Sequence, residues 1–210
     1  MAILAFLAPM SVRAELIDRV VASVNHEVIT LSELRQAVAF NTALSGKGNG
    51  RLLETETLQG IINRRLLLQE AYRLRVGEVS EQEIAAETAR LHQRFGTEEA
   101  FRDFLARTDL NEAQLSRLLG ERLLVERFVE KKIGLFARVS RDDVQSYYNE
   151  HPDEFKGKRF SEVQKQVTSY LSQQKVGQQL DQYVEELRGR TFIRINPLRE
   201  EGPVTEGSTP

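Results

Sequence analysis

The hydrophobic residues change their spacing once, near the start of the chain. Between Arg19 and Thr30, Val and Ile are dense and are interrupted by Asn25-His26, which predicts a strand, a tight turn and a second short strand. Thr30 and Glu33 then have capping-box spacing, in which each side chain accepts a hydrogen bond from the other residue's main-chain amide. A helix should begin there. Because two strands alone are marginally stable in water, this hairpin needs a third partner.

Most of the remaining sequence follows the helical period. Apolar residues recur three or four positions apart, and further capping-box pairs begin at Ser80, Asn111, Ser140 and Ser161. The predicted helices cover about 31–44, 54–75, 81–95, 111–135, 140–150 and 161–187, and a further short helix follows Thr97 and carries Phe101, Phe104 and Leu105. The second of them should be central, because its apolar band, which reaches Tyr72, is wider than one stripe.

The last predicted helix carries two apolar stripes. The first includes Val163, Val167 and Leu171, and the second begins at Val176 and reaches Leu187. The five-residue step from Leu171 to Val176 shifts the helical phase. At 1.5 Å per residue this helix is ~40 Å long, more than a small domain needs. We therefore expect one helix that touches two neighbours, or that bends between them.

A further strand is predicted at Thr191–Asn196, where Phe192 and Arg194 alternate with Ile193 and Ile195. By elimination it pairs with the hairpin, either at 20–24 or at 28–30. The predicted fold is therefore mainly α, with a small antiparallel sheet formed by the N-terminal hairpin at about 19–30 and a C-terminal strand at about 191–196.

Both ends of the chain differ in character from the predicted domain at 15–196. Residues 1–14, MAILAFLAPMSVRA, are apolar up to Pro9 and end in small residues, which predicts a signal peptide cleaved after Ala14. The run is too short to span a bilayer, and its alternative role is an apolar core strand. Residues 197–210 are rich in Gly, Pro, Glu and Thr, which is typical of a disordered tail.

Composition narrows the possible chemistry. The formal charge of -2 gives no bulk reason to expect nucleic acid as a partner, and the lack of Cys excludes disulfides and thiol catalysis. His26, His92 and His151 do not have metal-ligand spacing, and no glycine-rich loop links a strand to a helix. We therefore expect no catalytic residue, metal or cofactor.

An ordered series of segments resembles the SurA-type periplasmic chaperones and their relatives in the parvulin-linked foldase group. The segments are RVVASVNHEVITLSEL, LQGIINRRLLLQEAYRLRV at 58–76, FGTEEAFRDFLARTDLNEAQLSRLL at 95–119, VSRDDVQSYYNEHPDEF at 139–155, and the helix and strand at 160–196.

The chain departs from that group at one position. In such foldases a parvulin prolyl-isomerase domain often lies between the last two segments, whereas here only Lys156-Gly-Lys-Arg159 separates Phe155 from Phe160. The resemblance therefore implies the chaperone module alone, related to SurA N-terminal domains and without the isomerase activity of the group.

The resemblance implies a periplasmic holdase for unfolded secreted or outer-membrane polypeptides that works without ATP. Extended clients could add to a sheet edge while their apolar side chains enter a groove between helices. The alternative is a non-enzymatic scaffold or adaptor in the cell envelope that binds one folded partner. The long helix also allows a homodimer formed by helix exchange. We expect no stable membrane insertion of the mature chain.

The candidate peptide-binding residues are aromatic side chains in the shorter helices, where apolar surface is hardest to cover. For each of them core packing is the alternative role. They are Phe95, Phe101, Phe104, Tyr147, Tyr148 and Phe155.

Overall fold

The computed structural model describes residues 18–45, 51–134 and 138–198, which form a mainly helical fold with one small sheet. The predicted signal peptide and residues 199–210 of the predicted tail lie outside the described residues. The elements are β1 (Val20–Val24), β2 (Glu27–Thr30), α1 (Leu31–Ser45), α2 (Arg51–Arg73), α3 (Glu81–Phe95), α4 (Glu98–Thr108), α5 (Glu112–Val129), the π-helical turn η1 (Glu130–Gly134), α6 (Arg141–Glu150), α7 (Phe160–Gly189) and β3 (Ile193–Ile195).

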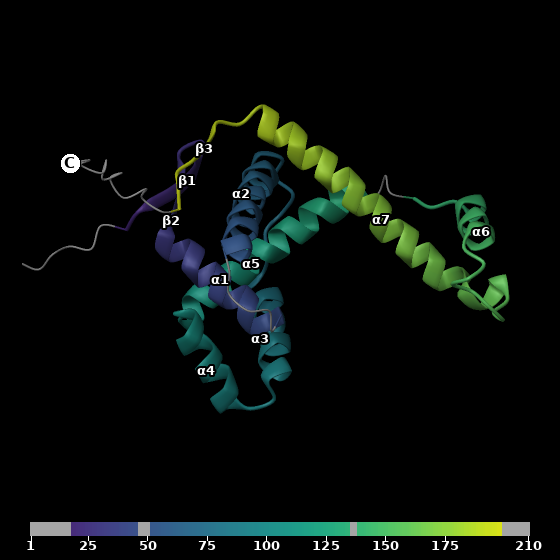
Figure 1. Cartoon of the computed structure of the whole chain (residues 1–210). Helices are drawn as coiled ribbons and strands as arrows, with labels where there is room; N and C mark the ends of the chain where they lie inside the picture. The colour runs from purple at the N-terminus through teal and green to yellow at the C-terminus, as the bar shows by residue number, and fades with distance from the viewer. Residues whose placement is uncertain (1–17, 46–50, 135–137, 199–210) are drawn as a thin grey trace, which may run out of the picture.

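The sheet joins segments from the two ends of the described chain (Figure 1). Its order is β2-β1-β3 and both pairings are antiparallel, so the predicted C-terminal strand is confirmed and its partner is β1. Asn25 makes the hairpin turn with φ 55°, a left-handed conformation that Asn tolerates. Ala22, Val24 and Ile29 share one face of the sheet and are fully buried.

Local hydrogen bonds explain where the helices begin. The capping boxes predicted at Ser80, Asn111 and Ser140 all form. At Thr30 only half of the box is present, because the Glu33 amide donates to Thr30 Oγ1 (3.2 Å) while the Glu33 carboxylate binds Arg65.

The capping box predicted at Ser161 is wrong, and α7 begins one residue earlier than predicted, at Phe160. The cap residue is Arg159, whose amide donates to the Glu162 carboxylate (3.0 Å). A carboxylate is a stronger acceptor for that amide than a neutral side chain. The long helix predicted to reach about 135 ends as an α-helix at Val129 and continues as the π-helical turn.

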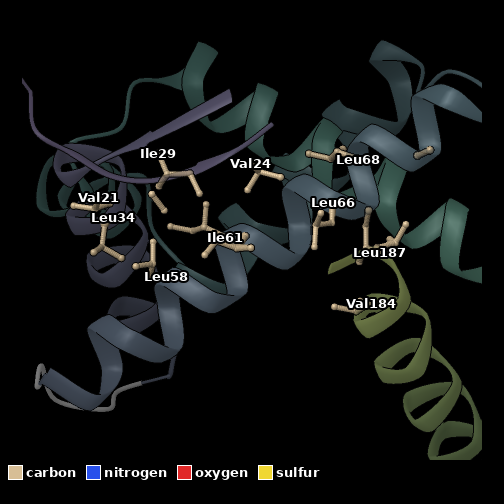
Figure 2. Close-up of a cluster of buried hydrophobic side chains, with 14 of the residues drawn as sticks. Val21, Val24, Ile29, Leu34, Leu58, Ile61, Leu66, Leu68, Val184 and Leu187 are labelled. Atoms are coloured by element: carbon tan, nitrogen blue, oxygen red, sulfur yellow. The ribbon is translucent and has the colours of Figure 1, made fainter. Parts of the chain in front are cut away.

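Helix α2 is the central element, as its wide apolar band predicts. Its buried side chains meet α1, α5, α7 and β1 (Figure 2). They are Leu58, Ile61, Ile62, Leu66, Leu67, Leu68 and Ala71. Tyr72 does not belong to this band, since it is 65% exposed. The helix ends at Arg73, so the Tyr72 ring lies at the last turn, beyond the surface that the neighbours cover.

The buried apolar residues, apart from Ile133 of η1, form three clusters. The largest joins the sheet with α1, α2, α5 and the C-terminal part of α7, and the second joins α3, α4 and the start of α5. The third holds Val144 of α6 and Val163 and Val167 of α7. We call described residues 18–134 and 176–198 the body and residues 138–175 the arm. Figure 1 shows α7 running from the body into the arm, which confirms one helix with two sets of neighbours.

Candidate functional site

The three phenylalanines predicted as peptide contacts lie together in the second cluster of the body. The Phe95 and Phe104 ring centroids are 4.6 Å apart, and Phe101 lies 6.1 Å from Phe104. Phe104 is 0% exposed and Phe101 is 5% exposed, while Phe95 is half-buried. Phe101 and Phe104 therefore form the core that holds α3 and α4 together, and only Phe95 presents part of its ring to the surface.

The other three predicted residues, Tyr147, Tyr148 and Phe155, meet in the arm and are half-buried. Tyr148 stacks on Phe155 with centroids 5.3 Å apart, and its hydroxyl donates to the Lys158 carbonyl (2.8 Å). With Pro152 and Lys158, Tyr148 and Phe155 line a cleft of about 380 Å³ at the turn between α6 and α7. The structure thus divides the six predicted residues into two separate groups.

A larger groove lies elsewhere, between α1, α2 and the start of α5, with a volume of about 860 Å³. None of the six predicted residues lines it. Its apolar side chains come from all three walls and include Ala37, Phe40, Leu44, Leu53, Ile61 and Leu118. In sequence these positions look like ordinary members of amphipathic stripes, so the residue pattern alone does not distinguish a groove from a closed core.

Polar side chains lie among the apolar residues that line this groove. Arg65 binds the Glu33 carboxylate (2.9 Å) and lies 3.4 Å from Glu27, while Gln36 donates to the Asp109 carbonyl (2.6 Å). Arg64 also lines the groove and is half-buried. Burial lowers the pKa of the Arg64 guanidinium, and the nearby charges of Glu121 and Glu33 oppose that effect.

The free edge of β3 offers a different kind of surface. The register and the hydrogen bonds show that the main-chain groups of Phe192, Arg194 and Asn196 point toward β1. Because these groups alternate in direction along a strand, those of Ile193 and Ile195 face away from β1. In the described part of the chain no strand pairs with this edge. Phe192 is 70% exposed beside it. An extended polypeptide could add a strand here.

Glu70 fixes the position of α7 against α2. Its carboxylate accepts hydrogen bonds from Arg73 (2.6 and 2.8 Å), from the Tyr183 hydroxyl (2.6 Å) and from Arg190 (3.0 Å). Hydrogen bonding from Arg73, with smaller contributions from Tyr183 and Arg190, lowers the pKa of Glu70 to about 2. The Glu70 side chain is 6% exposed, so this cluster ties two buried elements together.

The described residues contain no group of His, Asp and Glu that could hold a metal ion. Within the same residues, no helix combines the length and apolarity that a membrane crossing requires. The described residues form a helical module with a groove between α1, α2 and α5, and a sheet unites the two ends of this module.

Residues 1–129 match the family described as the SurA-like N-terminal domain. Because the match covers more than half of the 210 residues, the chain belongs to that family. No curated protein matches the chain.

A solved structure with the same fold comes from Campylobacter jejuni. It belongs to a study of the virulence factor PEB4 and the periplasmic protein Cj1289, described as structurally related SurA-like chaperones. The match has a TM-score of 0.55 and 14% identity, and it covers 84% of this chain and 98% of the other.

Proposed function

We propose that this protein is a periplasmic holdase, a chaperone that binds unfolded secreted or outer-membrane polypeptides without ATP. The observation that carries the proposal is the groove of about 860 Å³ between α1, α2 and α5, whose walls are partly apolar and open to solvent. Membership of the SurA-like N-terminal domain family supports a chaperone role, and so does the fold shared with a structure from work on SurA-like chaperones.

The groove suits clients of varied sequence. Apolar client side chains would contact Phe40, Leu44 and Leu118, while the free β3 edge would hydrogen-bond an extended client main chain. The charged residues, 29% of the chain, keep the surface around such apolar areas soluble. Binding of this kind is weak and tolerant of sequence, and release would follow client folding or transfer.

The proposed activity is non-enzymatic. Residues 151–159 connect α6 directly to α7, at the position where parvulin-linked foldases often hold their isomerase domain. The full chain should therefore leave a proline-limited refolding reaction at its uncatalysed rate. A robust acceleration of that reaction would contradict this part of the proposal.

The main test blocks the groove without disturbing the fold. Gly60 lies on the exposed side of α2, lines the groove, and has open space where a side chain would begin. Gly60→Tyr would fill the groove, and replacing a helical glycine favours the helix. Gly177→Tyr is the matched control, because Gly177 is also helical, has the same open space and lies outside the groove on α7.

The measurement is suppression of aggregation of an unfolded outer-membrane protein at up to equimolar ratio. The wild type and Gly177→Tyr should suppress aggregation, and Gly60→Tyr should lose most of that effect while melting at the wild-type temperature or above. Equal activity of the two variants would place client binding outside the groove. No suppression by the wild type would contradict the holdase itself, and capture of one stoichiometric folded partner from a periplasmic extract would favour the scaffold alternative.

We also propose that a homodimer can form by exchange of α7. The helix reaches from the arm to the body, so its C-terminal part could pack into a second copy as it packs here. Light scattering of the full chain measures this directly, and a mass of one chain at all concentrations would contradict it.

A further inference from the structure

We propose that Arg64 makes the groove selective for a carboxylate on the bound polypeptide, carried by an acidic side chain or by the chain's C-terminus beside apolar residues. This inference rests on the proposed function and specifies which client segments the groove prefers.

Arg64 is unusual among the half-buried arginines because its guanidinium has no hydrogen bond or ion pair with any described residue, and its Nε is buried without a partner. Arg19 and Arg65 share a buried, unpaired Nε, but Arg19 donates to the Leu198 carbonyl and Arg65 binds Glu33. Buried polar groups are normally hydrogen-bonded, so the buried Nε of an arginine that has no other partner among the described residues calls for an explanation.

Arg188 has a structural role only, and its guanidinium finds hydrogen-bond acceptors within the fold. Its guanidinium donates to Asn63 Oδ1 (2.6 and 3.0 Å) and to Gln59 Oε1 (2.7 Å), which fixes α7 against α2. Arg64 follows Asn63 directly in α2, yet it lines the groove instead of meeting a neighbouring helix in this way. Its open donors therefore belong to the groove.

The acidic residues near Arg64 do not supply the missing acceptors. Glu33 is taken by Arg65 at 2.9 Å. Glu121 stabilises the charged form of Arg64 but makes no ion pair with it. The guanidinium thus stays charged while its hydrogen-bonding capacity remains available. A carboxylate can accept two parallel hydrogen bonds from such a group.

The walls of the groove define what else the occupant must carry. Ala37, Ile61 and Leu118 line it and suit apolar side chains next to the carboxylate. The formal charges of its walls balance, because four acidic residues face four arginines: Glu33, Glu56, Asp109 and Glu121, and Arg64, Arg65, Arg117 and Arg122. Glu121 could in turn accept a hydrogen bond from the main chain of the same peptide.

The test uses three labelled peptides with one shared apolar sequence and measures binding by fluorescence anisotropy. The first contains Asp and has an amidated C-terminus, the second has Asn in place of Asp and is amidated, and the third has Asn and a free C-terminal carboxylate. The full chain should bind the first peptide, the third peptide or both about tenfold more tightly than the neutral second peptide. Tighter binding of the first peptide would identify an acidic side chain as the source of the carboxylate, and tighter binding of the third would identify the C-terminus.

Arg64→Met should bring the three affinities together, because it removes the charge and keeps a long side chain. Arg117→Met is the matched control: Arg117 lines the same groove but is exposed on α5, so most of the preference should survive. Arg64→Met should also melt at the wild-type temperature or above, since its guanidinium makes no hydrogen bond or ion pair with a described residue and its buried Nε has no partner.

Equal affinity of the wild type for all three peptides, with aggregation still suppressed, would overturn the carboxylate preference and leave the holdase proposal standing. A preference that persists in Arg64→Met would also overturn it. A marked fall in the melting temperature of Arg64→Met would show that the guanidinium is already satisfied within the fold. If no peptide binds and no aggregation is suppressed, the proposed function fails and the inference fails with it.

Discussion

The body and the arm are both built from helices with apolar stripes, yet far more apolar side chains are buried in the body than in the arm. In the body the sheet, α1, α2, α5 and the end of α7 share one continuous core. In the arm only Val144, Val163 and Val167 are buried, and half-buried aromatic rings surround them. Whether an apolar stripe of a helix is covered completely or only in part therefore depends on how many other elements pack against that helix.

The ion pairs of the two regions differ in the same way. Glu70 in the body is 6% exposed and is satisfied from two helices and from Arg190. In the arm, Lys175 joins Asp143 at 2.9 Å with both side chains well exposed, and it also donates to the Arg138 carbonyl. Exposed pairs contribute little to stability, so the arm depends chiefly on its small aromatic and valine cluster.

The largest expected effect comes from a cavity in the body. Phe128 is fully buried beside Tyr183, with ring centroids 5.8 Å apart. Phe128→Ala should lower the free energy of unfolding by about 3–5 kcal/mol, measured by urea denaturation. Phe155→Ala in the arm removes a half-buried ring and should cost clearly less. Equal losses for the two variants would mean that the arm is as tightly packed as the body.

A truncation tests whether the sheet holds the ends of the body together. A chain ending at Arg190 lacks β3, which pairs with β1 across Ala22–Val24. The free energy of unfolding of the whole body should fall by about 3 kcal/mol, because main-chain hydrogen bonds and the apolar contact of Ile193 are lost. A chain ending at Leu198 is the control and should melt like the full protein. If both truncated chains melt alike, β3 does not close the body.

Glu70→Gln should lower the free energy of unfolding by about 2 kcal/mol, since it leaves Tyr183 and two arginines with a neutral partner. Glu126→Gln is the control, because Glu126 pairs with Arg122 at 2.8 Å on an exposed helix face and should cost at most ~0.5 kcal/mol. Thermal unfolding at pH 7 measures both. A Glu70→Gln protein as stable as the control would show that this cluster does not hold α7 in place.

The same residue predicts a pH dependence. The folded-state pKa of Glu70 is about 2, below its ordinary value of 4.5. Its stabilising contribution is therefore complete above about pH 4.5 and is lost as the pH falls toward 2. Between those values the stability difference between wild type and Glu70→Gln should shrink steadily. A difference that stays constant over this range would contradict the assignment.

The smallest effect is expected in the arm. Val167→Ala removes part of a buried side chain from the α6–α7 contact and should cost ~1 kcal/mol. Hydrogen exchange should become faster in α6 and in the N-terminal half of α7, with the body unchanged, because local opening follows local packing. Faster exchange throughout the body would show that the two regions unfold as one unit.

The sequence alone determined most of the secondary structure, because its signals are local. The capping pairs at Ser80, Asn111 and Ser140 place helix starts within one turn of chain. Alternation of side chains predicts the strand that the structure has at Ile193–Ile195, and elimination of other partners predicts its pairing with the hairpin. The two stripes of the last helix likewise predicted two sets of neighbours, which α7 has in the body and the arm.

Only the tertiary structure decided which apolar surfaces remain open. Periodicity marks the apolar face of a helix but does not say which neighbour covers it, so it predicts a buried Tyr72, whereas the structure exposes this side chain. Phe104 was a candidate contact and lies in a closed core, whereas Phe40 lines the groove. Arg64 gives no signal in sequence, because the lack of a hydrogen-bond partner for its guanidinium among the described residues is recognised only when those residues have been located in space.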